Sequence, residues 1–421
     1  MSKGSRFFYG WVVVGISLVS MPLIYGLRHS FSVFFPHILH EFGWNRGSTV
    51  IMFSLNNLVY GLLAPVAGSL GDRWKPEKVM PIGLIVLVLA TASCGFANTL
   101  SHFYLLFGIL MPIGTAFCGW PLLAPALANW FSKRRGLVIG LGSMGGGLSF
   151  VYGMFAEFTI SNVGWRYAYF VLAGTLVVLI LPLYHFFHYR PESRNLKPYG
   201  ADELPSPKDF VSESGTVIKG TVPRVWTLHQ VLKTRQLWLM VFSYFLYWGI
   251  GVYTVVAHQV KYAQDAGYSG MFSASMLVLY GIFMAAGQMS ASISDWVGRE
   301  KTLTFATILS MSALVALLSV KDTSRPGLLY LHATCFGYGA GLWTATLYAA
   351  LADLFHGRHF GEIAGLLLTG QGIGGAIGPW LGGHIYDVSG SYRISLLICM
   401  ICFGAACIMI WTAAPRKAVL A

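Results

Sequence analysis

The chain has 421 residues, of which 55% are hydrophobic and only 10% are charged, and its mean hydropathy is +0.63. Soluble proteins carry about 25% charged residues because their surface must be hydrated, so this composition excludes a soluble globule and predicts a chain surrounded by lipid. The net charge of +12 does not indicate nucleic-acid binding, because the basic residues gather in short segments between apolar runs.

Twelve apolar runs are long enough to cross a bilayer as helices, which takes about 20 residues each. In chain order the predicted spans are 8–35, 48–71, 78–98, 103–131, 136–160, 166–189, 237–262, 271–295, 301–319, 326–354, 361–386 and 393–414. Only the segment 190–236 is both long and polar. We therefore expect an all-α membrane protein with a six-helix bundle over 1–189, a cytoplasmic linker over 190–236 and a second six-helix bundle over 237–421.

The distribution of lysine and arginine predicts the orientation, because short cytoplasmic loops are enriched in both. Most of the 28 lysines and arginines lie near the termini, in the loops after even-numbered spans, or in the linker. The opposite loops carry Arg46, Arg166, Lys261, Lys321, Arg325 and Arg393, and Arg28 lies within a span. We expect both termini and the linker on the cytoplasmic side of the cytoplasmic (inner) cell membrane.

The sequence has no pattern typical of an enzyme or a cofactor site. Its six cysteines all fall within apolar runs and lack metal-ligand spacing. The glycine-rich stretches 140–147 and 370–378 lie inside predicted spans, so we interpret them as close helix packing rather than as nucleotide-binding loops. Since no Walker-type loop and no nucleophile–base arrangement occurs, we expect no catalysis, no cofactor and no metal.

An internal repeat relates the two predicted bundles. Asp72, after the second span, is followed six residues later by Lys78, and Asp295, after the eighth span, is followed six residues later by Lys301. Two further pairs of segments have nearly the same offset: 130–136 against 354–361, and 164–166 against 391–393. These matches indicate parallel repeats related by an axis along the membrane normal.

The segment 68–78 resembles the loop motif of the major facilitator superfamily, and the resemblance covers essentially the whole chain. It implies the fold of that superfamily, with twelve helices in two pseudo-symmetric bundles. It also implies that charges at the cytoplasmic helix ends pair across the two halves and close the inner mouth in one state. The predicted gating residues are Asp72, Arg73, Lys78, Arg134, Arg135, Asp295, Arg299 and Lys301. The alternative is that these charges only fix the topology.

Four other segments resemble one branch of the superfamily, which contains monocarboxylate porters and oxalate/formate antiporters. They are 9–14, 121–137, 228–238 and 378–392. The resemblance implies transport of small organic anions such as lactate, pyruvate, formate or oxalate, together with protons or by exchange. The chain departs from this branch where the substrate carboxylate is usually held. Span 8 has Gly287 at the position of the usual arginine, and span 11 has Gln371 but no lysine.

Ionisable residues within a bilayer are energetically unfavourable and are therefore the first candidates for function. Arg28 and His29 are neighbours in the first span, where an arginine offers a charged fork for a carboxylate and a histidine can take up a proton. Adjacent helical residues point about 100° apart, so only one of the two is expected to face the substrate. The branch often has a basic residue here, and His29 matches that position best. The alternative for Arg28 is a side chain that reaches the membrane surface.

His29, Glu157 of the fifth span and His258 of the seventh are candidates for proton coupling. Glu157 is a lone carboxylate, either a proton site or a counter-ion to Arg28 or His29. The full predicted substrate site is Arg28, His29, Asn57, Trp120, Tyr253, His258, Tyr280, Tyr338, Thr369 and Gln371. Aromatic rings with a single polar atom suit the tail and the oxygen of an organic acid, and packing between helices is the alternative role for each of them.

We expect a secondary transporter that works by alternating access without ATP and moves a small organic anion, with a monocarboxylate as first choice. Its expected partners are this solute, protons or a counter-substrate, and the lipid bilayer, and we expect a monomer. The alternative within the same fold is an exporter or importer of a neutral or zwitterionic metabolite or drug. A sensor in transporter form is a third class, which the lack of a signalling domain disfavours.

Overall fold

The computed structural model describes residues 8–73, 76–131, 135–200, 228–355 and 360–413, and nearly all of them are helical. We call α1 to α9 the N-terminal group and α10 to α18 the C-terminal group. The N-terminal group consists of α1 (Gly10–His29), α2 (Phe31–Phe42), α3 (Arg46–Arg73), α4 (Pro76–Cys94), α5 (Leu100–Phe103), the π-helix η1 (Tyr104–Leu110), α6 (Met111–Cys118), α7 (Trp120–Trp130), α8 (Arg135–Leu148), the 3₁₀ turn η2 (Ser149–Val151) and α9 (Tyr152–His185).

The 3₁₀ turn η3 (Pro191–Arg194) follows the N-terminal group. The C-terminal group consists of α10 (Leu228–Leu232), α11 (Arg235–Tyr244), the π-helix η6 (Phe245–Val252), α12 (Tyr253–Asp265), α13 (Gly270–Met289), the 3₁₀ turn η7 (Ser290–Ser292), α14 (Ile293–Val297), α15 (Arg299–Leu318), α16 (Pro326–Phe355), α17 (Phe360–Ser389) and α18 (Arg393–Ala413).

These helices account for twelve membrane crossings. Nine helical stretches in the described part of the chain are long and apolar enough to span a bilayer. One of them, Gly140–His185, holds two crossings, because Gly164 breaks it with a φ of 82°, a left-handed conformation that favours glycine. The less apolar α16 and α17, each 30 residues long, supply the last two crossings. The predicted twelve-helix fold is therefore confirmed.

The first crossing is longer than predicted. The expected span ended at residue 35, where the apolar run gives way to Pro36 and His37, but α2 continues to Phe42. Gly43 ends it in the left-handed conformation, with its N–H bonded to the carbonyl of Leu39 at 2.9 Å. The prediction failed because polarity marks the limit of the lipid contact and not the limit of the helix.

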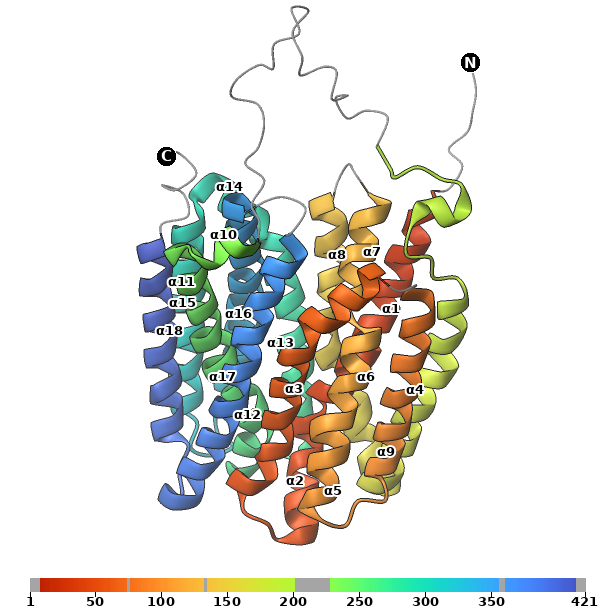
Figure 1. The fold of residues 1–421 in the computed structure, drawn as a ribbon. Helices are drawn as coiled ribbons and strands as arrows, with labels where there is room; N and C mark the ends of the chain where they lie inside the picture. Colours follow the sequence, from red (N-terminus) through yellow and green to blue (C-terminus); the bar gives the residue numbers. More distant parts are fainter. Residues whose placement is uncertain (1–7, 74–75, 132–134, 201–227, 356–359, 414–421) are drawn as a thin grey trace, which may run out of the picture.

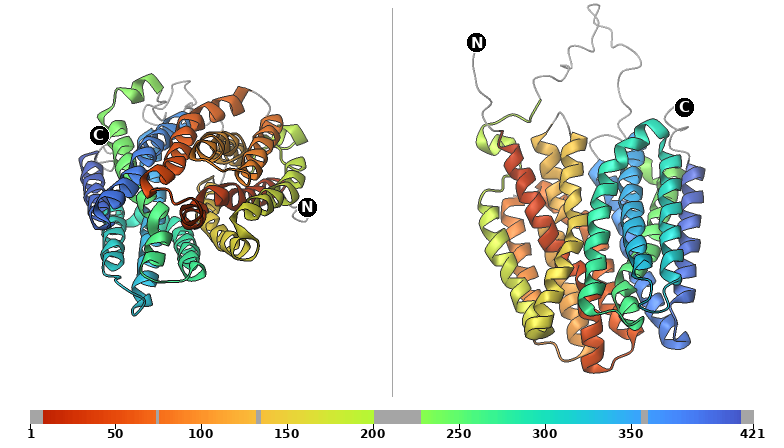
Figure 2. Two further views of the ribbon diagram at one scale, coloured as in Figure 1. Left: turned by 90° about the horizontal axis from the view of Figure 1, so that it is seen from below. Right: turned by 180° about the vertical axis from the view of Figure 1, so that it is seen from behind.

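The two groups lie side by side with their helices roughly parallel (Figures 1 and 2). α3 packs along α17, α8 and α9 pack against α13, and α2 packs against α12. Glycines permit this close approach, since a Cβ on Gly372 would lie 2.7 Å from the Cα of Gly61, and a Cβ on Gly147 would lie 2.9 Å from the backbone of Ala285. The predicted packing role is confirmed for these glycines, whereas Gly140 in the same stretch faces open space.

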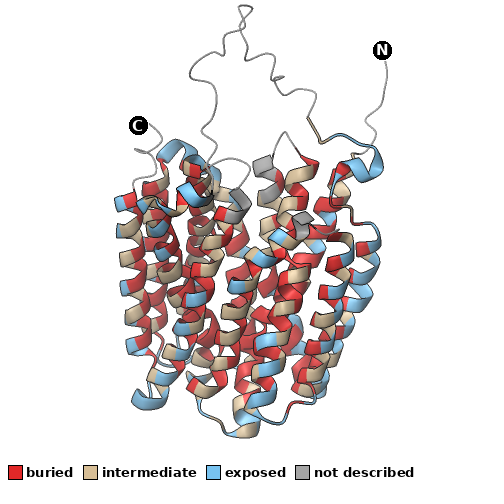
Figure 3. Cartoon of the chain, in the orientation of Figure 1, coloured by how far each residue is buried: buried red, intermediate tan, exposed pale blue. Residues whose placement is uncertain are grey.

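Buried residues fill the interior of the molecule, and exposed residues lie on its outer surface (Figure 3). Large apolar side chains are exposed around the outside, among them Ile82 at 62%, Leu89 at 61%, Val178 at 70% and Ile401 at 71%. In water such a surface would aggregate, so a bilayer must cover it.

The molecule has two distinct ends. The start of α1 and the end of α18 lie at one end, which we call the terminal face, and α5 and the end of α2 lie at the other, which we call the opposite face (Figure 1). Candidate sites occur midway between the faces and at the opposite face.

Candidate functional site

Arg28 lies in the last turn of α1 and is only 2% exposed, so its side chain does not reach the membrane surface. Its Nη2 donates a hydrogen bond to Oδ1 of Asn57 on α3, and it lies 3.4 Å from the hydroxyl of Tyr253 at the start of α12. The ring of Tyr60 on α3 covers the guanidinium group, with Cζ 4.7 Å from the ring centroid. Neighbours from both groups therefore surround this cation.

The partners of Arg28 carry no negative charge. Among the described residues no carboxylate lies within 4.0 Å of its guanidinium nitrogens, and its buried Nε has no hydrogen-bond acceptor. A buried cation without a counter-charge is energetically unfavourable, and hydrogen bonds to neutral groups compensate only part of the lost hydration. The arrangement therefore offers an anion a positive group with free donor capacity.

Gln371 and Gly375 of α17 complete this arrangement from the C-terminal group. Nε2 of Gln371 on α17 donates to the hydroxyl of Tyr253 at 2.9 Å. Gly375, one turn further along α17, allows α12 and α3 to approach α17 closely. A Cβ at this position would lie 2.7 Å from the Tyr253 ring and 2.8 Å from Cβ of Asn57. We call Arg28, Asn57, Tyr60, Tyr253 and Gln371 the Arg28 cluster.

Tyr60 and its neighbour Tyr25 were absent from the predicted site. Their hydroxyls are hydrogen-bonded to each other beside Arg28, and both side chains are buried. Tyr25 lies three residues before Arg28 on α1, and Tyr60 lies three residues after Asn57 on α3. Residues at that spacing share a helix face, so the helical periodicity around the two predicted residues contained the signal.

His29 points away from the Arg28 cluster. Its Nδ1 is 2.6 Å from Oγ of Ser149, and its ring stacks on Phe150 with centroids 4.1 Å apart. Tyr280 of α13 meets the same Phe150 ring edge-on at 4.7 Å, and among the described residues its buried hydroxyl has no partner. Of the two neighbours in the first span, Arg28 is thus the one that is hydrogen-bonded to a residue of the C-terminal group.

The other predicted substrate residues are dispersed. His258 of α12 contacts α17 and the residue before α18, with Nε2 2.9 Å from the carbonyl oxygen of Pro379 and Nδ1 3.2 Å from the hydroxyl of Tyr392. Thr369 donates to the carbonyl oxygen of Gly61 at 3.2 Å, across the boundary between the groups. Trp120 and Tyr338 are half-buried, on α7 and α16.

Glu157 pairs with a residue that the sequence did not single out. Its Oε2 lies 3.2 Å from Nε2 of His37 on α2, near the opposite face. Of the two roles considered for Glu157, the counter-ion to Arg28 or His29 is therefore wrong in this structure, and the proton site stays a prediction. The cause is the extension of the first crossing beyond its predicted end, which brings His37 alongside α9.

A second charged cluster joins the two groups at the opposite face. Both carboxylate oxygens of Asp387, at the end of α17, accept backbone N–H groups at the start of α3, from Arg46 at 2.9 Å and Gly47 at 2.6 Å. The Arg46 guanidinium binds Asp265 of α12 at 2.6 Å and the hydroxyl of Tyr392 at 2.9 Å. It also stacks on Tyr386 at 3.6 Å from the ring centroid. We call Arg46, Asp265, Tyr386, Asp387 and Tyr392 the Arg46 cluster.

The predicted gating residues lie at the terminal face. Arg299 binds Asp295 at 2.6 Å and Asp353 at 2.8 Å, all within the C-terminal group. Among the residues that the structure describes, Asp295 thus has its basic partner within the same group, in Arg299 one turn along the chain. Lys78 and Lys301 are exposed. Arg134 and the side chains of Asp72, Arg73 and Arg135 lie outside the described part of the chain.

The twelve crossings and the two clusters between the groups fit a transporter, and comparison with known proteins decides the family. The profile of the Major Facilitator Superfamily matches residues 14–379 and, in a second match, residues 293–420. The chain belongs to the major facilitator superfamily. Its relatives there are transporters, so it is a membrane transporter and not an enzyme.

Relatives within the superfamily include monocarboxylate transporters. The chain is 25% identical over 408 residues to monocarboxylate transporter 11 of Mus musculus, which covers 93% of this chain and 84% of the relative. It is 25% identical over 399 residues to monocarboxylate transporter 13 of Rattus norvegicus, with 93% and 85% covered. It is 23% identical over 402 residues to monocarboxylate transporter 2 of Homo sapiens, with 93% and 82% covered. The chain is thus a member that resembles the monocarboxylate porters.

Solved structures of the superfamily show the same fold. A bacterial homologue of the human lysosomal transporter Spinster, in an inward-facing and unoccupied conformation, has a TM-score of 0.65 at 15% identity, with 99% of this chain and 97% of that chain covered. The inward-facing and occupied conformation of such a homologue has a TM-score of 0.63 at the same identity and coverage. At this identity the likeness concerns the fold alone.

Proposed function

We propose that this transporter carries a small organic anion with a single carboxylate, and that the carboxylate binds Arg28. The observation that supports this proposal is the buried guanidinium at the boundary of the two groups, with neutral neighbours and a free Nε. An arginine binds a planar carboxylate through two parallel hydrogen bonds, which neutral partners do not replace.

The charge of the site favours a monocarboxylate. α13 and α17, which supply the substrate-binding cations in the resembling branch, carry no lysine or arginine between Gly270 and Met289 or between residues 363 and 389. One cation balances one carboxylate, whereas a second carboxylate would remain unneutralised inside the membrane. The names of the relatives, monocarboxylate transporters 11, 13 and 2, agree with this choice.

The position of the Arg28 cluster supports transport by alternating access. Arg28 and Asn57 belong to the N-terminal group, whereas Tyr253 and Gln371 belong to the C-terminal group. A solute that binds between them contacts both groups, so binding energy can favour one relative position of the groups over the other. We propose that the segments 1–189 and 237–421 move as two bodies about this site, as in other transporters built from parallel repeats.

The Arg46 cluster fits the role of the outer gate. We propose that the terminal face is cytoplasmic, since most lysines and arginines lie in its loops. The Arg46 cluster then closes the outer mouth of the structure described here, and it must separate when the mouth opens. Coupling to protons or exchange against a counter-substrate both remain part of the proposal.

Uptake into reconstituted vesicles tests the anion site. We expect the unchanged protein to take up labelled L-lactate, pyruvate or formate. Arg28→Gln should lower the affinity for the anion more than a hundredfold, and so its uptake, because breaking a buried ion pair costs about 3–5 kcal/mol. Arg28→Lys should recover only part of the loss, since an ammonium group lacks the planar fork. Arg166→Gln is the matched control, because Arg166 binds Glu41 at the opposite face within the N-terminal group.

Two results would count against the anion. Uptake of all three acids by Arg28→Gln at the rate of the unchanged protein would refute the role of Arg28. Uptake of a neutral or zwitterionic solute such as alanine, with none of the three acids, would instead favour the exporter or importer of an uncharged metabolite.

A further inference from the structure

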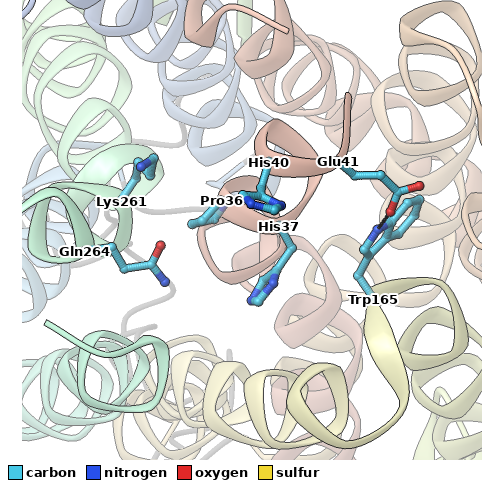
Figure 4. A pocket seen from close by; sticks show the side chains of 7 residues that line it. All are labelled: Pro36, His37, His40, Glu41, Trp165, Lys261 and Gln264. Carbon is cyan, nitrogen blue, oxygen red and sulfur yellow. Dashed lines mark hydrogen bonds between the residues drawn. The ribbon is translucent and has the colours of Figure 1, made fainter. Parts of the chain in front are cut away.

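A cavity of about 460 Å³ lies at the opposite face between the two groups. Figure 4 shows His37 and His40 of α2 facing Lys261 and Gln264 of α12 across it. The complete lining is Pro36, His37, His40, Glu41, Trp165, Lys261 and Gln264. The proposed Arg28 site does not involve these residues, so the cavity requires an explanation of its own.

A carboxylate–imidazole pair borders this cavity. Nε2 of His37 is 3.2 Å from Oε2 of Glu157, and the hydroxyl of Ser161 lies 3.4 Å from the other carboxylate oxygen. The His37 side chain is 32% exposed, whereas the Glu157 side chain is only 4% exposed. A proton from the medium therefore reaches this pair through His37.

The same carboxylate touches the C-terminal group. A Cβ placed on Gly270, the first residue of α13, would lie 2.3 Å from Oε1 of Glu157, so the carboxylate packs directly against the start of that helix. The first N–H groups of a helix lack partners within it and carry a partial positive charge. A negatively charged Glu157 thus attracts α13 and helps to hold the two groups together at this face.

The charged neighbours of the pair are bound elsewhere. On α12, Lys261 binds Asp265 at 2.6 Å, and Asp265 also binds Arg46. On α2 and α9, Glu41 binds Arg166 at 2.9 Å. Two other titratable side chains lie near the opposite face: His40 of α2, on the wall of the same cavity, and Cys94 at the end of α4. The first two turns of α13 carry no titratable side chain. Glu157 and His37 are thus the titratable groups in contact with each other at the start of α13.

We propose that Glu157 and His37 form a proton-binding site that senses the medium at the opposite face and controls the opening of that face. With a neutral imidazole the pair carries one negative charge, and after the imidazole takes up one proton it carries none. Proton uptake therefore weakens the attraction to α13 and favours separation of the groups. Imidazole is the side chain suited to respond to ordinary changes of external pH.

This inference goes beyond the proposed function and does not depend on which solute is carried. The test therefore uses no solute. Spin labels on Ser101→Cys and Ser324→Cys, exposed residues of the opposite face in different groups, report the separation of the groups in a full-length chain whose six native cysteines are replaced. We expect the population with long distances to rise about twofold to fivefold between pH 8 and pH 5.5, the range that corresponds to the loss of one charge beside a helix N-terminus.

Substitutions of Glu157 and His37 should change the long-distance population in opposite directions. Glu157→Gln removes the charge permanently, so the long-distance population should be raised at both pH values. His37→Gln removes the proton acceptor and keeps the carboxylate charged, so the short distances should persist at pH 5.5. A role in packing alone would not give opposite directions. His40→Gln, one turn along α2 on the wall of the same cavity, should respond to pH as the unchanged protein does.

Three outcomes would overturn the proposal. The first is a distance distribution of the unchanged protein that does not depend on pH. The second is a pH response that survives in both Glu157→Gln and His37→Gln. The third is a response lost in His40→Gln but kept in His37→Gln, which would assign the sensing to the other histidine.

Discussion

Replacing Asp387 by alanine removes the carboxylate that joins the end of α17 to the start of α3. In the structure this carboxylate accepts the N–H of Arg46 at 2.9 Å and the N–H of Gly47 at 2.6 Å. Both bonds cross from one group to the other, so they exist only while the opposite face is closed. Asp387→Ala should therefore destabilise the closed state and leave the open state, in which the side chain is hydrated, nearly unchanged.

The size of the effect follows from the exposure of Asp387. Hydrogen bonds to a charged acceptor contribute about 1.5–3 kcal/mol when they are well shielded. Asp387 is an exposed residue, so water and salt reduce the contribution of this contact to about 1 kcal/mol. At 25 °C this corresponds to a shift of about fivefold in the ratio of open to closed molecules.

The spin-label pair at residues 101 and 324 measures this shift directly. We expect Asp387→Ala to raise the long-distance population about fivefold and high salt to reduce the difference, because exposed charges are screened. Glu41→Ala is the matched control, since Glu41 lies at the same face but binds Arg166 and Trp165 within the N-terminal group. An unchanged distance distribution in Asp387→Ala would refute the assignment of the Arg46 cluster as a gate, as would an equal shift in Glu41→Ala.

Three further predictions follow from the structure. Gly375→Ala should strongly reduce uptake of labelled L-lactate because the added Cβ would lie 2.7 Å from the Tyr253 ring, whereas Gly146→Ala, at a glycine with nothing within 4 Å, should leave uptake unchanged. Tyr253→Phe should shift the spin-label distances, because the hydrogen bond from Arg28 to Tyr253, which joins the two groups and contributes about 1 kcal/mol, is lost, while L-lactate should still raise the melting temperature through the remaining guanidinium. Reporter fusions after Gly200 and Ala421 should both be active on the cytoplasmic side, and activity outside from either one would contradict the proposed orientation.

The sequence alone determined the membrane class, the twelve crossings and the family resemblance. These follow from the length of the apolar runs and from the repeat of the Asp–Lys loop, which are local properties of the chain. Arg28 could also be selected from the sequence, because an arginine within an apolar run requires an explanation wherever its helix packs.

Tertiary structure decided which of these residues meet. Arg28 and His29 are both polar in the sequence, and only the tertiary structure gave them different surroundings, with side chains of α3 and α12 around Arg28 and the turn η2 beside His29. Glu157 acquired His37 as its partner because α2 continues past the apolar run. Hydrophobic patterns report which face of a helix avoids lipid, but they do not specify which helix packs against that face. The contacts of Arg46 with α12, α17 and Tyr392 of the other group follow from that packing and have no counterpart in the local sequence.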